Sequence, residues 1–133
     1  MKVFLTSLLA GLFIVVFGFK VNQEPKPWPV PDAAAKKANP VKTSKESVSA
    51  GKTLYNQHCA SCHGKQGLGD GNKAAQLKTH PGDFSTAAFQ GQSDGSLFYK
   101  VDEGRGDMPS FKKKIPDAND VWDLVNYMRT LKK

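Results

Sequence analysis

Both cysteines of the chain lie in the segment Cys59-Ala60-Ser61-Cys62-His63, which places two thiols and an imidazole side by side. Three kinds of site use such a C-x-x-C pair: a zinc site, a dithiol redox couple and a covalent haem attachment. A small domain depends strongly on a staple of this kind, because its hydrophobic core alone gives only marginal stability. The identity of this staple therefore decides what the chain can fold into.

A structural zinc site requires four ligands, often from a second C-x-x-C or a pair of histidines at fixed spacing. The chain has no third cysteine, and neither His58 nor His80 stands at zinc-finger spacing. In thioredoxin-like proteins the C-x-x-C pair lies at the start of a helix that follows a strand. Here the pair comes at the end of a segment that is expected to be helical, with no strand before it. Cysteines at i and i+3 place both sulfurs on one side, where they can join the two vinyl groups of a porphyrin. The pattern thus favours haem attachment, with His63 next to the iron.

The first part of the chain predicts two segments outside the folded domain. Residues 3–19 carry no charge, which is typical of a signal peptide or a short membrane anchor, and the absence of a small-residue cleavage pattern favours an anchor. Residues 20–43 contain five of the eight prolines and no apolar periodicity, which predicts a semi-rigid, solvated spacer. Trp28 is the one spacer residue that could dock elsewhere. The folded domain is expected to span residues 44–133.

That domain shows helical periodicity and no strand alternation, which predicts a small all-α fold. Ser44 or Ser47 can cap a first helix that runs to His58. Further helical segments are expected at 73–77, 93–104 and 117–131. The last has Asp117 as its cap and an apolar face formed by Val121, Leu124, Val125, Met128 and Leu131. Gly51 costs about 1 kcal/mol relative to alanine inside a helix, so another backbone is expected to cross there.

Over residues 44–133 the sequence resembles a class I cytochrome c. The matching segments are AGKTLYNQHC, Cys59-Ala60-Ser61-Cys62-His63-Gly64, GRGDMPSF and VWDLVNYMRTL. The resemblance implies one haem c joined through Cys59 and Cys62, surrounded by a haem-centred core. It also implies that the first and last helices cross at a small residue and an aromatic one, here Gly51 and Tyr127.

The resemblance further implies that a methionine in the loop before the last helix is the second axial ligand of the iron, opposite His63. Met108 has this position, whereas Met128 falls on the apolar face of the last helix and is interpreted as a core residue. The Pro81 carbonyl is the expected acceptor for the other ring nitrogen of His63. The expected cofactor-binding residues are Cys59, Cys62, His63 and Met108, with His63 and Met108 on the iron.

With both axial positions filled, the iron has no open site for a substrate, and the expected function is one-electron transfer, not enzymatic catalysis. The resemblance implies redox partners such as a respiratory dehydrogenase, a quinol-oxidising complex, an oxidase or a reductase. It also implies a location in the periplasm or on the outer face of the cytoplasmic membrane. The alternatives are a peroxidase-like or gas-sensing haem protein, or a haem subunit of a larger oxidoreductase.

More than half of the formal net charge of +7 lies before residue 44, so the basic composition does not indicate nucleic-acid binding. Lys112–Lys114 could form a docking patch for an acidic redox partner or simply a solvated loop. The RGD tripeptide at 105–107 is interpreted as a coincidental likeness to an adhesion sequence. His58 and His80 are interpreted as surface or helix-end residues.

Overall fold

A computed structural model describes residues 27–133, and the run at 3–19 lies outside this range. Its helices are α1 (Asp32–Ala35), α2 (Lys45–His58), α3 (Ala60–His63), the 3-10 turn η1 (Ala74–Gln76), α4 (Ala87–Gln90), α5 (Asp94–Glu103) and α6 (Ala118–Arg129). Within these residues the only strand-like pairing is an isolated bridge between Arg105 and Met108. The predicted all-α fold is therefore confirmed. None of the described helices combines the length and the apolar character needed to cross a bilayer.

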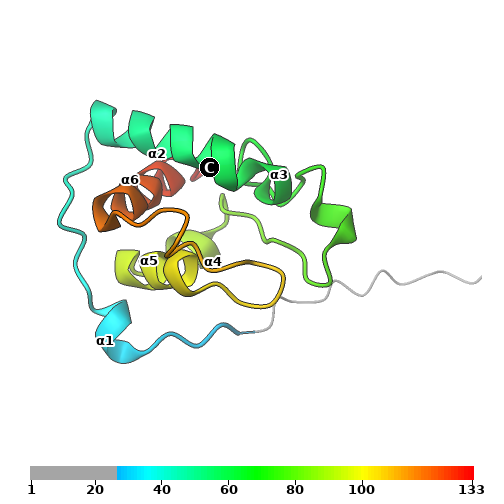
Figure 1. Cartoon of the computed structure of the whole chain (residues 1–133), viewed down its shortest axis with the longest axis horizontal. Helices are drawn as coiled ribbons and strands as arrows, with labels where there is room; N and C mark the ends of the chain where they lie inside the picture. Colours follow the sequence, from blue (N-terminus) through cyan, green and yellow to red (C-terminus); the bar gives the residue numbers. More distant parts are fainter. Residues whose placement is uncertain (1–26) are drawn as a thin grey trace, which may run out of the picture.

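Helices α2 and α6 pack across each other at one side of the molecule (Figure 1). Gly51 lies at the crossing, where a Cβ would overlap the backbone carbonyl of Asp123 and come within 2.9 Å of the Tyr127 Cβ. Only glycine allows the two backbones to approach this closely. The predicted crossing at Gly51 and Tyr127 is confirmed.

The three longer helices begin at the capping residues that the sequence indicates. The Ser44 hydroxyl accepts a hydrogen bond from the Ser47 N–H at 3.1 Å, and the Ser93 hydroxyl accepts one from the Ser96 N–H at 3.2 Å. The Asp117 carboxylate accepts from the Asn119 N–H at 2.8 Å. Each bond satisfies a backbone donor that has no partner within its own helix, which stabilises the first turn.

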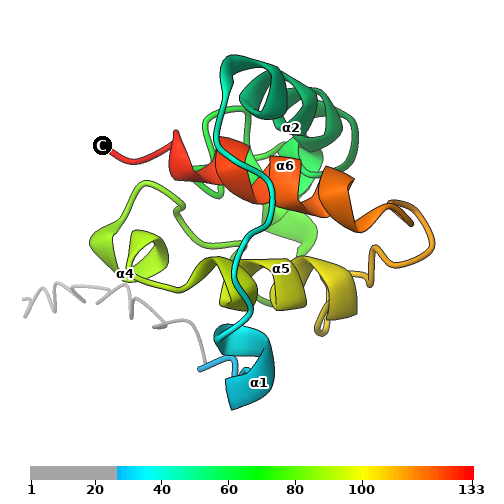
Figure 2. The ribbon, with the colours of Figure 1, turned by 90° about the vertical axis from the view of Figure 1, so that its left-hand side faces the viewer.

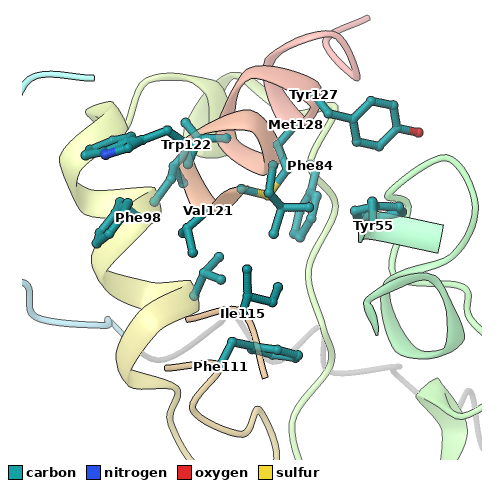
Figure 3. Close-up of a cluster of buried hydrophobic side chains, with 13 residues drawn as sticks. Tyr55, Phe84, Phe98, Phe111, Ile115, Val121, Trp122, Tyr127 and Met128 are labelled. Carbon is teal, nitrogen blue, oxygen red and sulfur yellow. The ribbon is translucent and has the colours of Figure 1, made fainter. Parts of the chain in front are cut away.

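The core is formed mainly by α6, with contributions from α2, α5 and two connecting segments (Figure 3). The predicted apolar face of α6 is buried at Val121, Leu124, Val125 and Met128, whereas Leu131 follows the helix and is half-buried. Trp122 is only 1% exposed and belongs to the core. Phe111 and Ile115 come from the segment before α6 and are buried beside Val121 (Figure 3).

Residues 27–43, here called the strap, run along the folded domain (Figure 2). The Ser93 hydroxyl donates to the Ala35 carbonyl at 2.6 Å, and Gly95 leaves room for the strap's backbone next to α5. Asn39 donates to the Asn126 side chain of α6 at 2.9 Å. Most strap residues are exposed, as expected of a spacer, but Ser93 and Asn126 pair with the strap's polar groups. The domain boundary at residue 44 stays a prediction.

Candidate haem site

The two cysteines occupy the junction between α2 and the short helix α3. The Cys59 N–H donates to the Tyr55 carbonyl at 2.8 Å, so Cys59 continues the hydrogen bonding of α2. The Cys59 carbonyl then accepts from the Cys62 N–H at 3.1 Å and from the His63 N–H at 2.9 Å. Both thiols are free and half-buried. This local geometry holds the two sulfurs and the imidazole on one helical turn, as the sequence predicts.

The environment of Cys59 does not suit chemistry that needs a thiolate. Burial, together with the smaller effect of the neighbouring Cys62, raises the pKa of the Cys59 thiol to about 12. Zinc ligation and thiol–disulfide exchange both use the thiolate form. In residues 27–133, moreover, no three His, Cys, Asp or Glu side chains gather where they could hold a metal ion. The zinc and dithiol alternatives are therefore disfavoured by the site itself.

His63 is half-buried, and its ring lies 4.6 Å from the Phe84 ring, centroid to centroid. Burial lowers the pKa of His63 to about 4, so the imidazole is neutral at pH 7 and able to bind a metal. The Pro81 carbonyl opposes this shift, as an acceptor facing the ring would. However, Nδ1 is buried and has no hydrogen bond of acceptable geometry. The Pro81 carbonyl, which is the predicted acceptor, therefore influences the His63 ring without a formed hydrogen bond.

The glycine-rich segment after His63 wraps back onto α3. The Gly69 N–H donates to the His63 carbonyl at 2.8 Å, and the Gly71 N–H donates to the Cys62 carbonyl at 3.2 Å. Gly71 lies so close to the backbone of α3 that a Cβ would come within 2.6 Å of the Cys62 carbonyl group. The buried Tyr55 hydroxyl donates to the Gly64 carbonyl at 2.7 Å. These contacts support the interpretation that the glycines allow a tight turn beside the attachment site.

Met108 lies in the loop of residues 104–110, here called the Met108 loop, between α5 and α6. Its side chain is half-buried and packs against the hydrophobic core. The loop is closed by two hydrogen bonds: Arg105 N–H to the Met108 carbonyl at 2.8 Å, and Met108 N–H to the Arg105 carbonyl at 3.1 Å. Met128 is 4% exposed inside the core, as predicted. Of the two methionines in the described residues, Met108 is the one at the edge of the core.

His58, His80 and Lys112, which the sequence also singled out, each contact another residue of the chain. His58 ends α2 with its ring 6.2 Å from that of Phe111, while His80 is exposed and accepts from the Gly82 N–H at 3.1 Å. Lys112 pairs with Glu103, which raises the pKa of Lys112. This ion pair commits one of the three adjacent lysines to an intramolecular contact.

Sequence reasoning missed Phe84 and Phe111, whose buried rings lie next to His63 and His58 respectively. Both residues belong to irregular segments, where neither helical nor strand periodicity marks a buried position. Their only sequence signal is their aromatic character. Together with the two thiols, a buried neutral imidazole and a thioether at the core edge, these residues fit a haem c.

Comparison with known proteins agrees with this fit. Residues 46–128 match the family model described as cytochrome c oxidase, cbb3-type, subunit III. Cytochrome c6 of Picosynechococcus sp. is 30% identical over 87 residues, covering 61% of this chain and 70% of that protein.

Two solved structures are also similar. A chain of the reducing HAO-like protein complex Kustc0457/Kustc0458 of Kuenenia stuttgartiensis aligns with a TM-score of 0.65 and 28% identity over 84% of this chain. Our chain spans about half of that one, 53% of its length. The KustC0563 c-type cytochrome aligns with a TM-score of 0.55 and 33% identity, over 62% of this chain and 98% of that one.

The family match covers more than half of the chain and includes most of α2 and α6, the attachment segment and the Met108 loop. The all-α fold and the paired cysteines have the same explanation, because a monohaem class I cytochrome c combines both. The chain therefore belongs to the c-type cytochrome family of the cbb3-type cytochrome c oxidase subunit III domain, and it carries one haem c joined covalently through Cys59 and Cys62.

Proposed function

We propose that this cytochrome is a one-electron carrier whose haem iron is bound by His63 and Met108. One observation carries the proposal: a half-buried, neutral imidazole follows the attachment cysteines, and a methionine is held in a hydrogen-bonded loop at the core edge. A thioether ligand raises the reduction potential of a haem. When bound, the haem supplies one-electron exchange, and filled axial positions leave no open site for a substrate.

We also propose that the exchange takes place outside the cytoplasm, between respiratory redox proteins. The family description names a subunit of a cytochrome c oxidase, which supports an oxidase or reductase as electron acceptor. A dehydrogenase or a quinol-oxidising complex would supply the electron. In this arrangement residues 3–19 either direct export or hold the domain at the outer face of the cytoplasmic membrane.

Replacing Met108 by alanine in the haem-loaded protein tests the ligand assignment. We expect the variant to lose the weak far-red absorption band that methionine–iron coordination gives in oxidised c-type cytochromes, and to bind carbon monoxide when reduced. Met128→Leu is the matched control, because it alters a buried methionine of the core and should preserve the band. An unchanged band in Met108→Ala would contradict the proposed ligation. Carbon monoxide binding to the unmodified reduced protein would instead favour the peroxidase-like or gas-sensing alternative.

A second candidate function is that of a haem subunit in a larger oxidoreductase. It is favoured by the similarity to a chain of the Kuenenia stuttgartiensis reducing HAO-like protein complex. Native mass measurement after purification from the source cells under mild conditions separates the two functions. A complex of fixed composition supports the subunit, whereas a monomer that exchanges electrons rapidly with added redox proteins supports the free carrier.

A further inference from the structure

Arg105 and Asp107, the two charged residues just before Met108, are both held by parts of the chain outside the Met108 loop. On one side, an Arg105 guanidinium N–H donates to the Pro27 carbonyl at 2.8 Å. The Arg105 Cζ atom lies 4.5 Å from the centre of the Trp28 ring, which places the guanidinium over the ring. The first residues of the strap therefore contact the Met108 loop directly.

On the other side, the loop is joined to the long connection between α3 and α4. One Asp107 carboxylate oxygen accepts from the Lys78 N–H at 2.7 Å and from the Thr79 N–H at 3.2 Å. Both bonds have an ionised acceptor, which makes them stronger than hydrogen bonds between neutral groups. The RGD tripeptide thus has a structural role, because its arginine and its aspartate attach the loop to two separate segments.

Movement at Arg105 would be transmitted to Met108 through the backbone. Arg105 and Met108 exchange two hydrogen bonds, and the chain folds back so tightly that Gly104 adopts a φ of +70° against the backbone of residues 108–110. The four residues 105–108 therefore form one closed turn. Whatever fixes the Arg105 side chain also fixes the turn that carries the Met108 side chain.

A second cation also lies near the Trp28 ring. Lys100 Nζ is 5.5 Å from the ring centre, and the pKa of Lys100 is lowered by burial and, to a smaller extent, by repulsion from Arg105. The electron-rich face of an indole attracts cations. The ring thus compensates the repulsion that would otherwise push Arg105, and with it the Met108 turn, away from α5.

We propose that Trp28 is a positioning residue for Met108: the start of the strap clamps the Met108 loop through Arg105 and keeps the methionine sulfur at the haem. The inference rests on the proposed ligation by Met108. It assigns to the strap a role in the redox site, because release of Trp28 would increase the fraction of molecules in which the sixth position of the iron is open. An external ligand would then compete more successfully with Met108.

The test measures imidazole binding to the oxidised, haem-loaded full chain by absorption spectroscopy. We expect Trp28→Ala to raise the apparent imidazole affinity by about fivefold or more, since a cation–π contact of this kind has an equilibrium effect of that size. Trp28→Phe keeps an aromatic face and should stay within about twofold of the unmodified protein. The matched control is Lys37→Ala, because Lys37 contacts the domain elsewhere on the strap, 4.4 Å from the Phe98 ring centre.

An unchanged imidazole affinity in Trp28→Ala would overturn the clamp, and so would an equal increase in Lys37→Ala, which would indicate general loosening. Asp107→Ala provides a second, independent release of the same loop and should also raise the affinity. The far-red band of the unmodified oxidised protein separates the two proposals. Its absence would reject ligation by Met108 and the clamp together, whereas its presence with an unaffected Trp28→Ala would reject the clamp alone.

Discussion

At the scale of single residues, Gly51 and His63 each have one atomic feature that bears on the haem site. Gly51 lacks a Cβ, which lets α2, the helix that leads to the cysteines, approach the Asp123 carbonyl of α6 closely. His63 has a buried Nδ1 without a hydrogen-bond partner. A buried polar atom of this kind is rare in native proteins and often marks a functional site.

We predict that Gly51→Ala destabilises the domain although alanine is the better helix former. The added methyl group would overlap the Asp123 carbonyl, and overpacking typically costs about 1–3 kcal/mol, which exceeds a propensity gain of about 1 kcal/mol. Urea unfolding of the haem-loaded protein measures the difference. Lys52→Ala changes the adjacent exposed position and should stay within about 0.5 kcal/mol of the unmodified protein. Equal stability of Gly51→Ala would contradict the tight crossing.

The sequence identified the crossing glycine and the haem-attachment segment, because each has a local signal: a glycine inside a helical pattern, and a fixed C-x-x-C-H spacing. Met108 followed from the resemblance, and its ligation remains a prediction. The hydrogen bonds of Asp107 and the Arg105–Trp28 contact had no such signal. They join segments far apart in the chain, so they depend on how the loops meet in space.

At the scale of elements, the three long helices could be predicted, and the short turn expected at 73–77 is confirmed by η1, whereas the other short helices could not be predicted. Helices α2, α5 and α6 combine apolar periodicity with a capping side chain, and both features are visible in the sequence. Helices α1, α3 and α4 have four residues each, too few for a periodic pattern. Contacts with the rest of the domain must stabilise such single turns, because isolated helices this short do not form.

Within α6, Asn126 is the polar residue that joins this helix to the strap and to α2. Its Oδ1 accepts from Asn39 and Thr43, and its Nδ2 donates to the Val41 carbonyl and to the Ser47 hydroxyl. The side chain is 2% exposed. All four hydrogen-bonding positions of the amide are thus in use.

We predict that Asn126→Ala lowers the free energy of unfolding by about 2–4 kcal/mol, because partners that are partly buried lose their hydrogen bonds. The strap should also become more accessible, which limited proteolysis between residues 36 and 43 would detect. Asn119→Ala is the matched control: Asn119 is an exposed residue of the same helix, and its capping bond uses the backbone N–H. Proteolysis of the strap at an unchanged rate would contradict this role of Asn126.

At the scale of the whole molecule, the strap is the part that sequence reasoning described least well. Its prolines and lack of periodicity predict a solvated segment, but several backbone carbonyls of residues 27–43 and the side chains of Trp28, Lys37, Asn39 and Thr43 contact the domain. Backbone carbonyls are present at every position, so a sequence cannot show which of them find a partner. The domain residues that contact the strap lie at the start of α5, at Ser93 and Gly95, and in α6, at Asn126.

The haem should stabilise the loops of this molecule more than its helix crossing. The α2–α6 contact is made by protein atoms around Gly51, whereas Cys59 and Cys62, which join the haem, lie in the attachment segment next to the glycine-rich loop. A group that binds only the folded state stabilises it by mass action, and a covalent attachment makes that contribution permanent. Loss of the haem is therefore expected to lower the stability of the loops more than that of the crossing helices.

We predict that the double variant Cys59→Ala/Cys62→Ala, which cannot join the haem covalently, unfolds more than about 10 °C below the haem-loaded protein, since about 1 kcal/mol corresponds to about 4–8 °C in a domain of this size. Hydrogen exchange should accelerate first in residues 64–86 and in the Met108 loop, and least in α6. Ser61→Ala, between the two cysteines and exposed, is the matched control and should change neither quantity. If the double variant melted within a few degrees of the haem-loaded protein, the polypeptide core alone would be sufficient for the fold, and the haem would contribute little to its stability. Uniformly accelerated exchange in α6 and in the loops would instead mean that the helix crossing, too, depends on the haem.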